Sequence, residues 1–350
     1  MSNRLIFSSQ RLRWAFACVI EKFQPIEMRL PEDHNITVTE ASSSPRSRVN
    51  TPNLDLSSVL VIRNPVAGQR RGRRFQEGLE KLRGMVPRVE VCDTLARGDA
   101  LQRARDADGD LDAIIAAGGD GTINEVITGL MARPGGPLPL GILPLGTANV
   151  LAHELGLPIP VGQAVDVICR GAVGQIHLGQ ADGHPFAMMA GAGFDAMVVE
   201  DLPTGLKRVV GKGAYVWQTA RQWLRPLPGP YQVTFGDERV KASAVIAANG
   251  HYYGGRFVVA PAARLTEPSL ELCLFLGTGR WAAVRALLGL VTGRAHRLRD
   301  VRIVSVRAAR IEGQSTDPVQ ADGDIVTRLP VDLSIMPTPL PVILPNDGAA

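Results

Sequence analysis

The run from Ala113 to Glu125 places an apolar segment directly before a turn of glycines, an aspartate and a threonine. Within this turn, Gly118–Thr122, three residues lack a Cβ, so the backbone can take φ > 0 and direct several N–H groups to one point. A helix that begins near Thr122 would add unpaired N–H groups and the positive end of its dipole there. The spacing therefore predicts a binding site for a negatively charged group such as a phosphate.

Three further turns have a similar composition, and each follows a predicted strand. In Asn64–Gly68 the proline fixes φ, the glycine permits close approach of the backbone, and Asn64 can bond its own turn or a phosphate oxygen. Thr94 lies in the second turn, where it can cap a helix or contact a nucleotide. Residues 143–150 again combine a strand, a glycine turn and a helix. Each turn alone is compatible with an ordinary loop, but the four together favour one shared phosphate site.

Alternating strands and helices position these turns from Ser58 onward. Such alternation predicts a parallel sheet whose right-handed crossovers bring every strand-to-helix loop to the carboxyl edge, where open α/β folds bind ligands. We expect strands at residues 59–63, 89–92, 113–117 and 140–143, and helices at 72–85, 99–106, 122–132 and 147–155.

The pattern becomes rich in strands after Gly171, which predicts an antiparallel sandwich. We expect strands at residues 175–178, 186–190, 232–235, 242–249, 257–261, 270–276, 301–306 and 331–335, with helices near 212–224 and 281–290. The fold class is therefore α/β with two domains. An N-terminal Rossmann-like, parallel-sheet nucleotide-binding domain spans residues 54–174, a β-sandwich-like domain spans 175–324, and a flexible extension spans 1–53.

The composition and the spacing of cysteines and apolar residues argue against several classes of protein. Aromatic residues make up 5% of the 350 residues, too few for the stacking surface of a protein that binds single-stranded nucleic acid. The four cysteines form no C-x-x-C pair, which favours reduced thiols in the cytoplasm and argues against a zinc site. No apolar window reaches about 18 residues, the length of a membrane span, so we expect only peripheral contact with the inner face of the membrane. Residues 11–23 form either an interfacial helix or a frayed extension.

Several familiar phosphate-binding patterns are missing from the sequence. It has no G-x-x-x-x-G-K-[ST] loop, and Gly191-Ala-Gly193 lacks the third glycine of a dinucleotide fingerprint. The catalytic-loop and D-F-G signatures of protein kinases are also missing. These differences exclude the standard P-loop NTPases and protein kinases.

Three motifs in this order, Asn64-Pro-x-x-Gly68, Gly118-Gly-Asp-Gly-Thr-x-Asn-Glu125 and Pro144-Leu-Gly-Thr-Ala-Asn149, resemble the diacylglycerol kinase catalytic-domain family. The resemblance spans roughly residues 56–340, is greatest to the bacterial soluble lipid kinases, and implies that the chain returns to its first domain near 325–345. It also implies ATP and Mg²⁺ as cofactors and a lipid substrate for the domain at 175–324. The ATP contacts that it implies are Asn64, Pro65, Gly68, Thr94, Gly118, Gly119, Asp120, Gly121, Thr122, Asn124, Glu125, Gly146, Thr147 and Asn149.

Asp120 cannot favour an anion directly, so we expect it to act through Mg²⁺ or through a water network beside the triphosphate. The alternative is a structural aspartate that bonds the N–H groups of its own turn. A second metal position is implied where relatives carry D-G-x-L. This sequence departs from that pattern, with Glu267 in place of the aspartate and Pro268 in place of the glycine.

The family also has a late D-G-[DE] motif, which occurs here as Asp322-Gly-Asp324. The resemblance implies Asp324 as the base that takes the proton of a lipid hydroxyl, with Asp322 as the alternative. In an extended strand the two carboxylates would share a face and couple their proton affinities. By spacing alone, the motif predicts a hairpin turn.

These features together predict an ATP-dependent lipid kinase that phosphorylates a hydroxyl group of a lipid such as diacylglycerol or a sphingoid base. One alternative is an NAD kinase, which shares the G-G-D-G-T loop but pairs it with a downstream segment that is missing here. Another is an inactive lipid-binding or regulatory protein on the same scaffold. We expect a lipid substrate, contact with a membrane surface, no nucleic acid partner, and either a monomer or a homodimer.

Overall fold

The structure is a computed structural model that describes residues 55–67, 72–107, 110–193, 196, 229–253 and 257–346. The description below concerns the unit Thr51–Ala350. The predicted extension at 1–53, the predicted helix near 212–224 and the candidate residue Gly68 lie outside the described residues.

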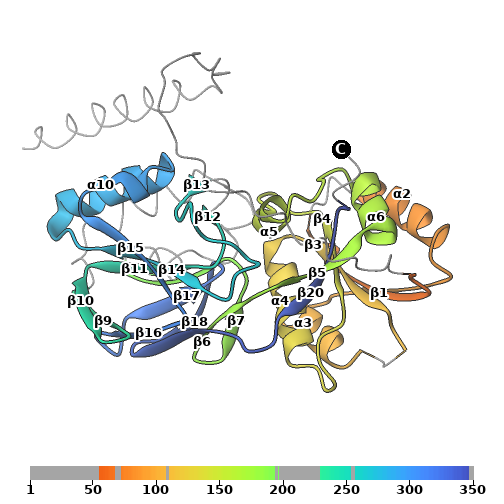
Figure 1. The fold of residues 1–350 in the computed structure, drawn as a ribbon. Coiled ribbons are helices and arrows are strands. Elements are labelled where there is room, and N and C mark those ends of the chain that lie inside the picture. The colour runs from red at the N-terminus through yellow and green to blue at the C-terminus, as the bar shows by residue number, and fades with distance from the viewer. Residues whose placement is uncertain are drawn as a thin grey trace, which may run out of the picture. The chain divides into compact units, whose positions relative to one another are not determined.

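A six-stranded sheet forms the N-terminal region, with the order β2-β1-β3-β4-β20-β5. Its strands are β1 (Ser58–Arg63), β2 (Arg88–Asp93), β3 (Ala113–Gly118), β4 (Leu140–Pro144), β20 (Leu340–Leu344) and β5 (Ala172–Ile176). All neighbouring strands are parallel except β5, which pairs antiparallel with β20. Figure 1 shows the blue C-terminal strand β20 within this sheet.

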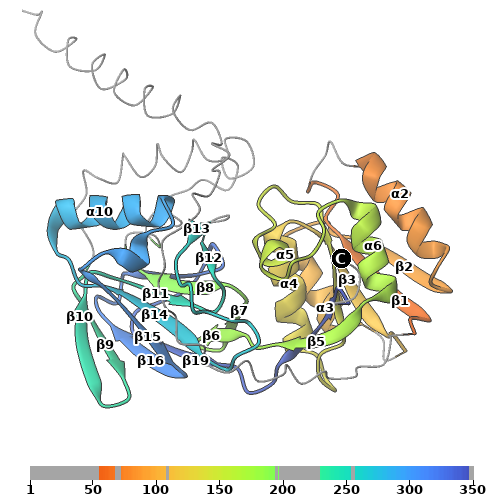
Figure 2. The ribbon, with the colours of Figure 1, turned by 45° about the horizontal axis from the view of Figure 1, so that its top comes forward.

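Helices cover both faces of this sheet (Figure 2). They are α2 (Gly72–Arg83), α3 (Asp99–Arg105), α4 (Asp120–Met131), α5 (Val150–Glu154) and α6 (Val161–Arg170). Successive side chains of β3 point to opposite faces: Ile114 packs with α3 and α4, whereas Ile115 packs with α2 and α6. Because side chains alternate along a strand and both faces are covered, β3 is an uninterrupted apolar run.

The C-terminal region consists of two six-stranded antiparallel sheets that pack face to face. The first has the order β10 (Glu238–Ala242), β9 (Tyr231–Phe235), β16 (Ala308–Glu312), β19 (Val331–Ile335), β6 (Gly179–Ala181) and β7 (His184–Phe186). The second has the order β15 (Val301–Val306), β14 (Leu270–Phe275), β11 (Ala244–Ala248), β8 (Met189–Ala192), β17 (Pro318–Ala321) and β18 (Asp324–Arg328).

Three smaller elements complete the described part of the C-terminal region. A two-stranded ribbon pairs β12 (Tyr252–Tyr253) with β13 (Phe257–Val258). Helix α10 (Gly279–Val291) is followed by the short 3₁₀ helix η2 (Ala295–Arg297). Within the described residues, no helix is long and apolar enough to span a membrane.

The two-domain α/β architecture confirms the predicted fold class, but one strand was placed in the wrong sheet, one helix was missed and one helix start was displaced. Residues 175–178 were expected in the sandwich, whereas β5 covers 172–176 and belongs to the N-terminal sheet. The cause is the distant strand β20, which supplies its partner. Helix α6 was not predicted, and α4 begins two residues before Thr122, at Asp120.

Candidate active site

Four turns meet at the carboxyl edge of the N-terminal sheet because backbone hydrogen bonds continue past the strand ends. The N–H of Asn64 donates to the carbonyl of Ala117 at 3.0 Å, and the N–H of Thr94 donates to that of Arg63 at 2.8 Å. The N–H groups of the two residues after β4 both donate to the carbonyl of Gly118, at 2.8 and 3.1 Å. The turns after β1, β2, β3 and β4 are therefore neighbours, as the alternation predicted.

Asn64 links the first turn to the third. Its Oδ1 accepts the N–H of Val66 at 3.0 Å, so the side chain bonds its own turn. Its Nδ2 donates to Oγ1 of Thr122 at 3.2 Å. Both of these candidate ATP residues are therefore held in fixed positions before any ligand binds.

Two of the three glycines of the third turn, Gly118 and Gly119, are closely packed, Gly121 has open space around it, and the expectation of φ > 0 was wrong for all three. Gly118, Gly119 and Gly121 are all outside the left-handed region, and Gly119 is extended at φ −93° and ψ −175°. A Cβ on Gly118 would lie 2.5 Å from Cβ of Thr122, and one on Gly146 would lie 2.5 Å from Cα of Gly119. Glycine is needed here because the third and fourth turns touch through their backbones.

Asp120 joins the third turn to the helix that follows the fourth. Its carboxylate accepts the N–H of Asn149 at 2.9 Å and the N–H of Val150 at 2.6 Å, at the start of α5. Asn149 has φ +48°, and its Nδ2 donates to the carbonyl of Gly146 at 3.0 Å. Asp120 thus bonds N–H groups of a neighbouring turn, and its charge favours the N-terminus of α5.

The remaining candidate ATP residues lie around the same edge. Pro65 and Thr147 are exposed in the first and fourth turns, and Gly121 is exposed in the first turn of α4. Asn124 and Glu125 lie farther along α4 and are half-buried.

The late aspartate motif forms a two-residue hairpin turn between β17 and β18. Asp322 and Gly323 both have positive φ, +48° and +87°, and Ala321 pairs with Asp324 across the hairpin. The prediction of a turn is confirmed, whereas the alternative of two aspartates on one face of an extended strand was wrong. Aspartate followed by glycine suits the left-handed conformations that such a turn requires.

The carboxylate of Asp322 is held by the backbone of a distant loop. It accepts the N–H groups of Ala187 at 2.6 Å, Met188 at 2.9 Å and Met189 at 2.9 Å. Burial raises the pKa of Asp322 to about 6, the three N–H donors oppose this rise, and the negative charge of Asp120 adds to it. The charges of Asp120 and Asp322 therefore interact, although the residues belong to different regions of the fold.

Asp324 has a different environment from Asp322. Its Oδ1 lies 2.9 Å from Nη2 of Arg97, in the loop between β2 and α3. The Asp324 side chain is 39% exposed. Both aspartates of the hairpin thus interact with residues at the carboxyl edge of the N-terminal sheet.

A second contact between the two regions was not predicted. The buried carboxylate of Glu154, at the end of α5, accepts the backbone N–H of His251 at 3.0 Å, and its Oε1 lies 2.5 Å from Nδ1 of the same residue. The guanidinium of Arg264 contacts the other ring nitrogen of His251. Because an arginine can only donate, His251 accepts at Nε2 and donates from Nδ1. No local pattern could reveal a pair that is 97 residues apart.

The candidate metal residue Glu267 is exposed in the loop before β14, and its role as a ligand stays a prediction. Across the described ranges, no group of three or more His, Cys, Asp or Glu side chains is arranged to hold a metal ion. The single carboxylate of Asp120 fits the way in which Mg²⁺ binds in kinases, through one or two carboxylates and the substrate phosphates.

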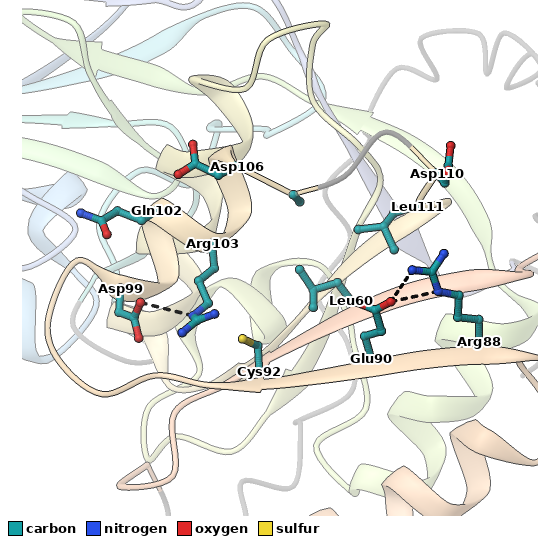
Figure 3. Close-up of a pocket in the computed structure, with 11 residues that line it drawn as sticks. Leu60, Arg88, Glu90, Cys92, Asp99, Gln102, Arg103, Asp106, Asp110 and Leu111 are labelled. Carbon is teal, nitrogen blue, oxygen red and sulfur yellow. Dashed lines mark hydrogen bonds and ion pairs between the residues drawn. The ribbon is translucent and has the colours of Figure 1, made fainter.

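A pocket of about 420 Å³ lies between β2 and α3, away from the predicted residues (Figure 3). Two ion pairs line it, Arg88 with Glu90 and Arg103 with Asp99, and the further carboxylates Asp106 and Asp110 make the lining acidic overall. None of the candidate ATP residues lines this pocket.

Comparison with known proteins identifies both regions of the chain. Residues 58–181 match the sequence model of the diacylglycerol kinase catalytic domain, and residues 188–344 match that of the YegS C-terminal NAD kinase beta sandwich-like domain. A probable lipid kinase YegS-like protein of Chromohalobacter salexigens is 28% identical, over 78% of this chain and 89% of its own. A diacylglycerol kinase of Bacillus subtilis is 26% identical, over 83% of this chain and 97% of its own.

Solved structures share the fold. One from Bacillus anthracis strain Sterne, titled as a diacylglycerol kinase, has a TM-score of 0.64 at 20% identity and covers 86% of this chain and all of its own. Another structure from the same strain has a TM-score of 0.70 at 23% identity and covers 84% of this chain and 99% of its own. With both regions matched and the motifs gathered at one sheet edge, the chain belongs to the diacylglycerol kinase catalytic-domain family of lipid kinases.

Proposed function

We propose that this protein transfers the γ-phosphate of ATP to a hydroxyl group of a lipid, such as diacylglycerol or a sphingoid base. The observation that carries the proposal is the position of the Asp322–Asp324 hairpin. Its first aspartate interacts with the charge of Asp120 in the third turn, and its second pairs with Arg97 in the loop after β2. A carboxylate that can accept a proton therefore lies beside a turn suited to phosphate.

The turn Gly118–Thr122 and the N-terminus of α4 would hold the phosphates. Helix α4 is 12 residues long, and its dipole and first N–H groups favour an anion at this end. Asn64 and Thr122 are already fixed by their mutual hydrogen bond. Gly121 is exposed and has open space around it, so its backbone is accessible to a triphosphate.

The contacts of the two hairpin aspartates favour Asp322 as the general base, whereas the sequence resemblance favours Asp324. The Asp324 carboxylate is neutralised by Arg97. Asp322 is fixed by three backbone N–H groups, and its Oδ2 accepts only one of them, from Ala187. A base is most effective when its pKa is near the working pH, and the pKa of Asp322 is about 6.

In the proposed step, the lipid hydroxyl oxygen bonds to the γ-phosphorus while the bond from phosphorus to the ADP oxygen breaks. Asp322 takes the hydroxyl proton. The pair of Asp324 and Arg97 keeps the hairpin in place. Mg²⁺ held near Asp120 would neutralise charge on the phosphates.

The test is incubation of the purified protein with labelled ATP and diacylglycerol, a sphingoid base or NAD in separate reactions. We expect label in a lipid. Because a general base supplies about 10²–10⁴-fold, Asp322→Asn should lower kcat at least about 100-fold, while ATP still binds in a calorimetric titration. Asp324→Asn is the matched control, and a smaller loss is expected.

Near-normal kcat in Asp322→Asn would overturn the assignment of the base. Label in NAD alone would indicate an NAD kinase. No binding of ATP by the unmodified protein would indicate an inactive scaffold.

A further inference from the structure

Helix α10 exposes two large apolar side chains. Trp281 is 82% exposed and Leu288 is 58% exposed. They are seven residues apart, which places both on the same side of the helix after two turns. Arg285 lies between them on this side and pairs with Asp300.

The other sides of α10 are anchored. Ala282 and Leu290 are buried at 7% and 8% exposure. A Cβ on Gly289 would lie 3.0 Å from Cα of Ala295, so the helix packs tightly against the segment that follows it. Figures 1 and 2 show α10 beside the sheet that contains β14 and β15. The exposed apolar side chains therefore belong to a fixed helix.

The charge of this region is strongly positive. Residues 276–300 contain five arginines and one acidic residue, Asp300, so their net charge is +4. All five arginines are exposed, and four of them, Arg280, Arg294, Arg297 and Arg299, lie outside the Arg285–Asp300 pair. Among the residues that the structure describes, no carboxylate forms an ion pair with any of the four.

We propose that Trp281, Leu288 and these four arginines form a docking surface for an anionic lipid bilayer, here named the α10 surface. Tryptophan is favoured at the boundary between headgroups and acyl chains, and clustered arginines are attracted to anionic headgroups. A second copy of this chain would present the same positive charge and be repelled. The inference rests on the proposed function, because a lipid substrate is reached at a bilayer.

The test measures sedimentation of the full-length protein with phosphatidylcholine vesicles that contain or lack phosphatidylglycerol. We expect binding only with the anionic lipid, and added salt should weaken this binding.

Trp281→Ala should weaken binding about tenfold, because the burial of a large apolar side chain is lost. Trp281→Phe should retain most of the binding. Arg294→Gln with Arg299→Gln should also weaken binding about tenfold. The matched control is Arg239→Gln with Arg307→Gln, two exposed arginines outside the α10 surface.

Kinase assays separate this inference from the proposed function. Trp281→Ala should keep the wild-type rate on a short-chain, water-soluble diacylglycerol and lose rate on vesicles. If vesicle binding follows the expected pattern but no lipid is phosphorylated, the proposed function is overturned and the α10 surface is still supported. Equal vesicle binding by the wild type and both α10 variants would overturn the inference. So would a change from dimer to monomer in Trp281→Ala by light scattering, which would mark a surface between copies.

Discussion

Asp120, Asp322 and Asp324 make different contacts because their surroundings differ. Asp120 accepts two N–H groups at the start of α5. Asp322 accepts three from a loop of the other region, and Asp324 pairs with an arginine. The sequence motifs place each aspartate in the site, but only the contacts distinguish a buried carboxyl of raised pKa from a half-exposed one in an ion pair.

The raised pKa of Asp322 predicts a dependence of stability on pH. Its pKa is about 6 in the folded chain against an ordinary value of 3.8, so the folded state keeps this proton to higher pH than the unfolded chain. The stabilising contribution is full below about pH 4 and is lost as pH rises through about 6. We expect the free energy of unfolding of Asp322→Asn to lack this decrease, although the variant also loses an acceptor for one backbone N–H.

Urea denaturation at a series of pH values checks this expectation, with Asp324→Asn as the control that keeps the decrease. An identical slope for wild type and Asp322→Asn across about pH 4 to 6 would contradict the assignment.

At the scale of elements, the five-residue helix α5 connects the two regions. A helix this short is not stable alone. Asp120 bonds its N-terminus, and its last residue, Glu154, holds His251 of the loop after β11. The helix is therefore bonded at its start to the Gly118–Thr122 turn and at its end to the C-terminal region.

We expect Glu154→Ala to lower the free energy of unfolding by about 1–3 kcal/mol, because it leaves the N–H of His251 without its buried acceptor. A double-mutant cycle with His251→Ala should give a coupling energy of about 0.5–3 kcal/mol. Chemical denaturation supplies both values. Glu267→Ala, which removes an exposed carboxylate, should change stability by less than about 0.5 kcal/mol. A coupling energy near zero would rule out a stabilising contact between the Glu154 carboxylate and the His251 ring.

At the scale of the whole described unit, the two regions share one buried cluster. It includes Ile62 and Ile127 of the N-terminal region together with Ile246 and Cys273 of the C-terminal region. Strand β14 is buried on both faces for this reason: Leu272 and Leu274 face the sandwich interior, and Cys273 faces the shared cluster. The regions are therefore distinct in topology but continuous in packing.

Strand β20 closes this unit, and its loss should prevent folding. Leu340, Val342 and Ile343 are at most 1% exposed, and β20 lies between β4 and β5. Removing buried aliphatic side chains costs about 2–5 kcal/mol each, so losing three would approach the whole stability of a typical domain, about 5–15 kcal/mol.

Circular dichroism and a protease-resistance assay would compare a chain that ends at residue 338 with one that ends at residue 346. The longer chain keeps β20 and the contact of Asn346 with the carbonyl of Arg170, and we expect it to fold. A folded shorter chain would show that β20 is dispensable.

Much of the structure of the N-terminal region can be predicted from the local sequence. The strands that end near Asn64, Thr94 and Gly118 are short apolar runs followed by polar turns, and parallel pairing alone brings those turns together. The hairpin at Asp322 was also predictable, because aspartate and glycine tolerate positive φ. Strand β5 and the contact between Glu154 and His251 could not be predicted from the sequence, because each depends on a partner far away in the chain.

The sequence by itself determined the family, the two-domain α/β fold and the identity of the residues in the Gly118–Thr122 turn, because these depend on residue type and short-range spacing. Only the tertiary structure decided that Gly118 and Gly119 are closely packed, that Asp120 bonds α5, and that Asp322 has the raised pKa. The physical reason is that burial, charge interaction and backbone contact arise between segments that the sequence separates by tens to hundreds of residues.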